Sequence, residues 1–332
     1  MNVITLATSL GGSGALEVVH GRSNPHIDPT LHIWGWEIPV YLFVGGLVAG
    51  IMIALASLEL RGQKHRRFAW MPFWGLILMS VGMVALFLDL EFKFHVWRFY
   101  TAFEWTSPMS WGSWLLLLVY PTLLLLWLGA LEDDQLSGLQ KGVRFLGLSG
   151  LTGALAEWSR AHRRGVLWTT ALVGVGLGTY TGLLLGTLGA RPLWNSAIMG
   201  PLFLVSGFST GAALLLLARP DGEAAHTLVR WDMFAIVVEL ILLAVLIMDR
   251  STASVTGQAG IELLLGGQWS MWFWGLVVGL GLLVPLLLEA LEVSKSVNVG
   301  VAAPLLVLIG GIALRTIMVS AGQHSTYAML VP

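Results

Sequence analysis

Long apolar stretches separated by short polar segments dominate this chain. Eight of them are long enough to cross the hydrocarbon core of a bilayer, which takes about 20 helical residues. They cover residues 36–60, 70–90, 112–131, 166–189, 197–218, 229–248, 270–291 and 300–319. The stretches lack the two-residue alternation of a membrane β-barrel. They therefore predict an all-α fold of transmembrane helices, in which each span satisfies its own backbone hydrogen bonds.

Composition agrees with this pattern and limits the possible functions. The 332 residues are 56% hydrophobic and 11% charged, whereas soluble domains carry about 25% charged residues. We therefore expect an integral protein of the lipid membrane. A net charge of −1 offers no basic surface for nucleic acid. The absence of cysteine excludes disulfides, cysteine-ligated iron–sulfur clusters and covalently attached haem in this protein.

The distribution of Lys and Arg predicts the orientation. Twelve lie in the connections after the first, third, fifth and seventh spans, and five lie on the opposite side. Because basic loops stay on the cytoplasmic side, both termini should face outward across a bacterial or archaeal cell (inner) membrane. Residues 1–14 lack the basic start and the unbroken apolar run of a secretory signal, so we expect the first span to be an uncleaved anchor.

Two segments of the sequence resemble each other. Residues 41–50 and 202–211 align so that Gly46 matches Gly207 and Gly50 matches Gly211. Four spans separate the copies, which predicts a parallel internal repeat. We therefore expect two four-helix bundles, arranged as an outer N-terminal segment 1–33, a first bundle 34–190 and a second bundle 191–332.

Polar side chains within or beside the spans are the candidates for function, because a charge at the bilayer centre costs about 2.5–3.5 kcal/mol. The predicted orientation puts most of them in the outer half or at its edge: Glu37, Tyr41, Asp89, Tyr180, Asp249 and Arg315. Two interpretations stay open. Asp89 and Asp249 are either site residues or hydrated interfacial carboxylates. The Tyr180 hydroxyl binds either a ligand or the backbone of a neighbouring helix.

Three carboxylates are spaced along the sixth span. Asp232 and Glu239 share a helix face, and Asp249 closes the outer end. They form either a proton path across the membrane or structural charge pairs. Haem is not expected, because none of the eight histidines lies in the middle of a span.

Three motifs indicate a family. They are Thr106-Ser-Pro-Met-Ser-Trp-Gly-Ser-Trp114, Ala190-Arg-Pro-Leu-Trp-Asn-Ser196, and Leu314-Arg-Thr followed by Ala321-Gly-Gln323. With the glycine-rich first span and eight helices, the protein resembles the NrfD/PsrC family from about residue 34 onward. The resemblance implies a subunit without its own haem or iron–sulfur cluster that binds quinone, either menaquinone or ubiquinone, near the outer face of the first bundle. It also implies two partners, a ferredoxin-type iron–sulfur subunit and, beyond it, a molybdopterin-type or cytochrome catalytic subunit.

The resemblance also suggests the site residues. The family tyrosine on the fourth helix corresponds to Tyr180, while Ile38 and Tyr41 stand where the polysulfide reductase has an asparagine and a histidine.

Our hypothesis is that Tyr41 and Tyr180 hydrogen-bond the quinone oxygens and that Glu37 and Asp89 transfer protons. Arg315 and His32 are further candidates for quinone contacts. The protein would then be the quinol-oxidising or quinone-reducing subunit of an oxidoreductase complex, inactive alone. The alternative is a proton- or ion-translocating subunit, or a pure membrane anchor, without its own redox site.

Overall fold

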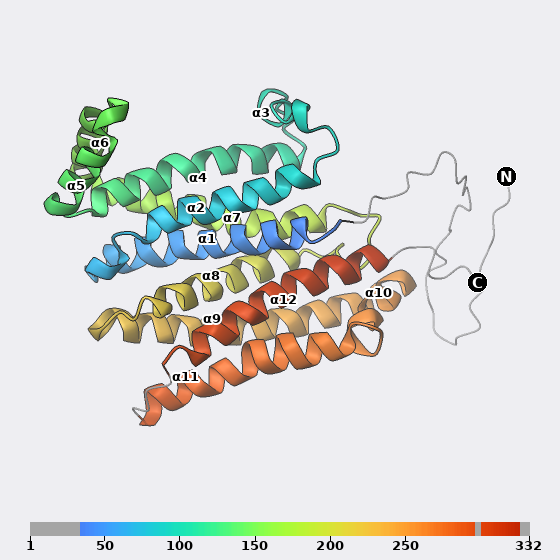
Figure 1. Ribbon diagram of the computed structural model, residues 1–332. Coiled ribbons are helices and arrows are strands. Elements are labelled where there is room, and N and C mark those ends of the chain that lie inside the picture. Colours follow the sequence, from blue (N-terminus) through green and yellow to red (C-terminus); the bar gives the residue numbers. More distant parts are fainter. Residues whose placement is uncertain (1–33, 296–299, 326–332) are drawn as a thin grey trace, which may run out of the picture.

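The computed structural model describes residues 34–295 and 300–325, and this part of the protein is entirely helical (Figure 1). Eight of its helices are long and apolar enough to cross a membrane, as predicted. These spans are α1 (Glu37–Leu60), α2 (Met71–Asp89), α4 (Pro108–Ala130), α7 (Arg163–Gly186), α8 (Met199–Leu217), α9 (Gly222–Thr252), the continuous pair η4 (Trp272–Leu283) and α11 (Val284–Lys295), and α12 (Ala302–His324). The η4 segment is a π-helix, wound more loosely than an α-helix.

Several shorter helices connect the spans. They are η1 (Arg66–Phe68), η2 (Lys93–His95), α3 (Arg98–Thr101), α5 (Asp133–Val143), η3 (Arg144–Leu146), α6 (Ser149–Ala161) and α10 (Val255–Leu265). The hydropathy pattern predicted spans alone and missed these elements. Local chemistry explains α5: Glu132 and Gln135 form a reciprocal capping box, and acidic residues occupy the first turn. In Figure 1, α5 and α6 are turned away from the common direction of the spans.

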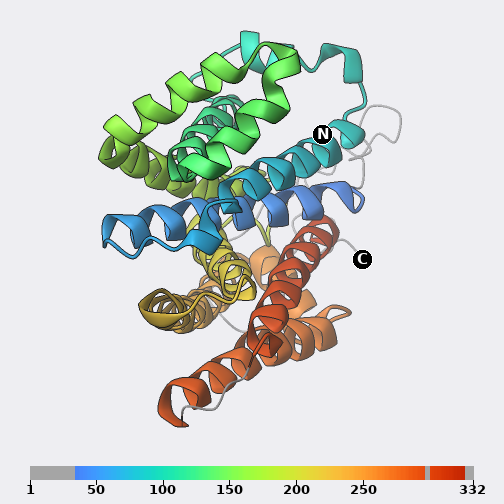
Figure 2. The same cartoon turned by 60° about the vertical axis from the view of Figure 1, so that its left-hand side comes forward.

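Helix α1 lies at the centre of the arrangement. It contacts α8, α7, α2 and α12 and is the most buried of the eight spans. In Figures 1 and 2, α1, α2, α4 and α7 gather on one side, and α8, α9, α11 and α12 gather on the other. The contact between α1 and α8 therefore joins the two groups of helices.

Glycines make this central contact possible. A β-carbon at Gly50 would lie 2.9 Å from the Cα of Gly211, and one at Gly207 would lie 2.7 Å from the carbonyl oxygen of Gly46. Both distances are too short for a real side chain, so the two backbones touch directly. Helices in lipid gain no hydrophobic energy by associating, and close backbone approach of this kind supplies van der Waals packing instead.

The beginning of α1 and the end of α12 meet at one end of the molecule. The Trp34 backbone N–H donates to Oε1 of Gln323 at 2.6 Å, and Nε2 of Gln323 donates to the Trp34 carbonyl at 3.1 Å. The assignment of this end to the outer side, the parallel repeat and the domain boundaries stay predictions.

Replacing Gly50 by alanine tests the central contact. We expect Gly50→Ala to lower the free energy of unfolding by about 1–3 kcal/mol, because the methyl group forces α1 and α8 apart. Gly138→Ala in α5 is the matched control, since a β-carbon there meets nothing within 4 Å and alanine favours the helix by up to about 1 kcal/mol. Thermal unfolding of both variants in the same detergent measures the difference, and equal behaviour would contradict the packing argument.

Candidate functional site

Two buried tyrosines face each other from α1 and α7. Tyr41 is 1% exposed and Tyr180 is 7% exposed, and their phenol groups are close enough to interact electrostatically. Glycines on two further spans leave space for the rings. A β-carbon at Gly82 in α2 would lie 3.7 Å from Cδ2 of Tyr41, and one at Gly112 in α4 would overlap the Tyr180 ring. Four helices of the first half of the protein therefore enclose this tyrosine pair.

The hydroxyls of the tyrosine pair are candidate donors to a ligand. Neither forms a hydrogen bond with any residue in ranges 34–295 and 300–325. A phenol in apolar surroundings stays protonated and can donate to a carbonyl oxygen. Tyr100 on α3 also interacts electrostatically with Tyr41. The pKa of the Tyr100 phenol is raised above its ordinary value by burial and then by Tyr120, so Tyr100 is protonated as well.

The predicted proton-transfer residues occupy helix ends. Glu37 is the first residue of α1, half-buried, and a carboxylate there is stabilised by the positive end of the helix dipole. It precedes Tyr41 by one helical turn, while Ile38 beside it is buried. Asp89 is the last residue of α2 and is half-buried. His32 lies outside the described residues.

Arg315 is fully buried among α1, α8 and α12. Its guanidinium donates to the Ser206 hydroxyl at 2.5 Å and to the carbonyls of Phe203 and Gly311 at 3.1 and 3.2 Å. Its Nε has no partner among the described residues. A β-carbon at Gly46 would lie 3.1 Å from its Nη2. Arg315 is thus held chiefly by α8, next to the glycine contact.

A second polar group lies within the second half of the protein. Asp232 and Glu239, both on α9, are buried. Ser209 Oγ donates to Oδ1 of Asp232 at 2.5 Å, and Glu239 lies beside Ser206 and Arg315. The sequence analysis missed Glu289 on α11, which is buried against Asp232. Glu289 falls within the predicted seventh span, so the rule that selected Glu239 could have found it.

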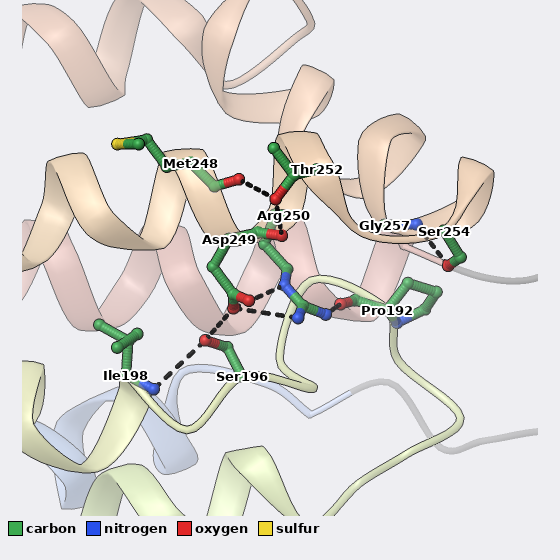
Figure 3. Close-up of polar contacts among 9 residues, drawn as sticks. All are labelled: Pro192, Ser196, Ile198, Met248, Asp249, Arg250, Thr252, Ser254 and Gly257. Carbon is green, nitrogen blue, oxygen red and sulfur yellow. Dashed lines mark hydrogen bonds and ion pairs between the residues drawn. The ribbon is translucent and has the colours of Figure 1, made fainter. Parts of the chain in front are cut away.

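Asp249, at the outer end predicted for the carboxylate series, anchors a loop (Figure 3). It accepts a hydrogen bond from Ser196 Oγ at 2.6 Å and pairs with Arg250 at 3.0 Å. Arg250 in turn donates to the Pro192 carbonyl at 3.1 Å. These contacts fasten residues 192–196 to the end of α9. Whether Asp249 also carries protons stays a prediction.

The Arg191–Ser196 stretch ties several segments together. Trp194 donates from its indole to the Met318 carbonyl at 2.7 Å and stacks on Trp34 with ring centroids 5.4 Å apart. Arg191 donates to the Gln323 carbonyl. Desolvation lowers the pKa of the Arg191 guanidinium from its ordinary value. This motif therefore connects the segment before α1 with the end of α12.

Within residues 34–295 and 300–325, no group of three or more His, Cys, Asp or Glu side chains is placed to hold a metal ion. The tyrosine pair suits a neutral ligand with carbonyl oxygens, since it offers hydroxyl donors within apolar walls.

Comparisons with known proteins agree on one family. The family model described as "Polysulphide reductase, NrfD" matches residues 24–326. The sequence is 31% identical to Protein NrfD of Escherichia coli over 306 residues, covering 88% of this protein and 95% of that one. It is 29% identical to one chain of the polysulfide reductase of Wolinella succinogenes, covering 88% and 94%. One subunit of the selenate reductase of Mesobacillus selenatarsenatis is 25% identical, covering 86% and 73%.

Removal of the Ser196 hydroxyl tests the loop anchor. We expect Ser196→Ala to speed hydrogen–deuterium exchange across residues 190–198, because a hydrogen bond to a charged group contributes about 1.5–3 kcal/mol. Thr252→Ala is the control, since that hydroxyl bonds carbonyls of its own helix. Unchanged exchange in the loop of the Ser196 variant would show that Asp249 does not anchor it.

Proposed function

Since this chain belongs to the NrfD polysulphide reductase family, we propose that it is the quinone-binding membrane subunit of a respiratory oxidoreductase complex. It exchanges electrons between the quinone pool and an iron–sulfur partner. The observation that carries this proposal is the buried Tyr41–Tyr180 pair, whose hydroxyls have no partner among the described residues. Menaquinone and ubiquinone both present the carbonyl oxygens that such donors bind.

The tyrosines bind and orient the quinone ring. A quinone supplies two-electron, two-proton chemistry when bound. Tyr41 and Tyr180 donate hydrogen bonds to its oxygens, and the apolar side chains of α1, α2, α4 and α7 exclude water. An apolar groove of about 410 Å³ on α2, lined by Leu76, Val81 and Val84 among others, offers a path for a prenyl tail.

In this proposal, Glu37 and Asp89 transfer protons to and from the quinone. Glu37 is half-buried one helical turn from Tyr41, so its carboxylate can hold a proton beside the ring position and exchange it with water at the helix end. Asp89 is the corresponding candidate at the end of α2. Ile38 contributes apolar wall. Arg315 on α12 bonds α8 and lies close to Gly46 of α1, which supports a role at the junction of the two halves.

The partners belong to the same proposal. The Wolinella and Mesobacillus relatives are named as single components of a polysulfide reductase and a selenate reductase, which supports partner subunits here. We propose a ferredoxin-type iron–sulfur protein at the end that carries Tyr41, followed by a molybdopterin-type or cytochrome catalytic subunit. Exposed aromatic side chains gather at that end, including Phe94 and Trp105. The direct packing of the α1 glycines on the α8 glycines supports the parallel repeat of two bundles.

A second candidate function is proton translocation. Its support is the set of buried carboxyls Asp232, Glu239 and Glu289 in the second half of the protein. The two functions are compatible, because quinone chemistry consumes or releases protons. A pure membrane anchor would have no use for carboxyls at these positions, which are costly to bury.

Removal of the tyrosine hydroxyls tests the quinone site. We expect Tyr180→Phe and Tyr41→Phe each to lower quinone turnover by the intact complex about 10- to 100-fold, the equivalent of roughly 1–3 kcal/mol for a buried hydrogen bond. Folding should persist, because neither hydroxyl bonds another described residue. Tyr120→Phe is the control, since that hydroxyl bonds Ser80 at 3.2 Å outside the pair. Undiminished turnover in Tyr180→Phe would overturn the site.

Replacement of Glu37 tests the proton-transfer role separately. We expect Glu37→Gln to lower kcat about 100-fold or more with little change in KM, the loss typical of a missing general acid or base. The exposed Glu91→Gln serves as the matched control. A variant with normal kcat and an unchanged pH profile would assign Glu37 to the helix dipole alone.

A further inference from the structure

Two carboxyl groups are buried against each other at the contact between α9 and α11. Asp232 is 0% exposed and Glu289 is 1% exposed. The two side chains lie within hydrogen-bonding reach of each other. Oδ2 of Asp232 and both carboxyl oxygens of Glu289 have no hydroxyl or N–H donor among the described residues.

This geometry requires a proton. Two ionised carboxylates in contact repel each other, and burial removes the water that would weaken the repulsion. Ser209 supplies one donor to Oδ1 of Asp232 and leaves the facing oxygens without any. A single proton placed between the carboxyls removes the repulsion and satisfies both. Buried acid pairs that share one proton follow this rule.

A cavity at one end of the molecule extends to Glu289 of the pair. It has a volume of about 340 Å³ and is lined by Glu289, Glu292, Arg219, Pro304 and neighbouring residues. At about 30 Å³ per water molecule, this volume accommodates roughly ten. In Figure 1 the start of α9 and the end of α11 lie at this end, opposite the Trp34–Gln323 contact. It is the predicted inner side.

Polar groups continue from the pair toward the middle of the protein. Ser209 bonds Asp232, and Ser206 lies one helical turn before Ser209 on α8. Glu239 lies beside Ser206 and Arg315, and Arg315 borders Gly46 of α1. The series therefore runs from the cavity to the boundary with the half that contains the tyrosine pair.

We propose that Asp232 and Glu289 share one proton and form the entrance of a proton path that opens to this cavity. The path deepens the proposed function, since it would exchange quinone protons with the side opposite the iron–sulfur partner. The pair itself does not depend on quinone binding. The presence of the shared proton can therefore be tested independently of quinone binding.

Each transfer through the pair conserves protons and charge. Water in the cavity delivers a proton to Glu289 while the shared proton leaves Asp232 toward Ser209 and Glu239, so one proton enters as one departs. The charged groups around the pair are Glu292 on α11, Glu239 on α9 and Arg219 on the cavity wall. Transport in the opposite direction uses the same groups in reverse.

Infrared spectroscopy of the full-length protein in nanodiscs tests the shared proton. We expect a protonated carboxyl band that shifts in D₂O and changes its frequency in both Asp232→Asn and Glu289→Gln, because each variant removes one of the two groups that share the proton. Glu292→Gln, on the same cavity wall, should keep the band. Absence of the band in the unmodified protein, or its loss on adding Na⁺, would overturn the proposal, the latter in favour of a cation site.

Reconstitution of the complete complex tests the path. In liposomes, we expect Glu289→Gln to slow proton exchange on the cavity side at least about tenfold while the KM for quinone is unchanged. Undiminished exchange would overturn the path. Tyr180→Phe distinguishes the two proposals. It should lower turnover about 10- to 100-fold yet keep the infrared band, so a failed quinone-site proposal would not contradict the shared proton.

Discussion

The backbone contact between α1 and α8 is the constraint on which the remaining structure depends. Lipid tails are as apolar as the side chains of a span, so two helices associate only if they pack better against each other than against lipid. Gly46 and Gly50 against Gly207 and Gly211 provide that advantage. Tyr41 lies little more than one helical turn from this contact, and Arg315 lies directly beside it. The same contact therefore positions polar side chains in both halves of the protein.

The polar groups of the two halves differ in kind. The first half encloses the phenol hydroxyls of Tyr41 and Tyr180, which can donate hydrogen bonds without becoming charged. The second half encloses Asp232, Glu239 and Glu289, whose carboxyl groups are buried. Arg315 lies at the boundary and keeps a fixed charge beside Glu239. In the proposed function, this division separates ligand binding from proton transfer.

Much of this arrangement could be predicted from the sequence, and the limits have physical causes. Continuous apolar runs identify the eight spans, because the bilayer demands a fixed length of apolar helix. The same criterion passes over α5, α6 and α10, which are too short to cross. Tyr41 and Tyr180 were assigned to one site from the family resemblance, yet the contact between them depends on how α1 and α7 rotate against each other. The Asp232–Glu289 pair was missed for the same reason, since no spacing along one helix reveals a partner on another.

The glycine contact also restricts how the sequence can change over time. A crowded pair of ordinary side chains can drift, because enlargement of one is offset by reduction of the other. Between α1 and α8 such a compensating exchange is impossible, because glycine faces glycine and no smaller residue exists. Any first substitution at Gly50, Gly207 or Gly211 therefore crowds the opposing backbone before a second substitution can relieve it. The glycines at the contact between α1 and α8 therefore cannot be exchanged through a series of neutral substitutions.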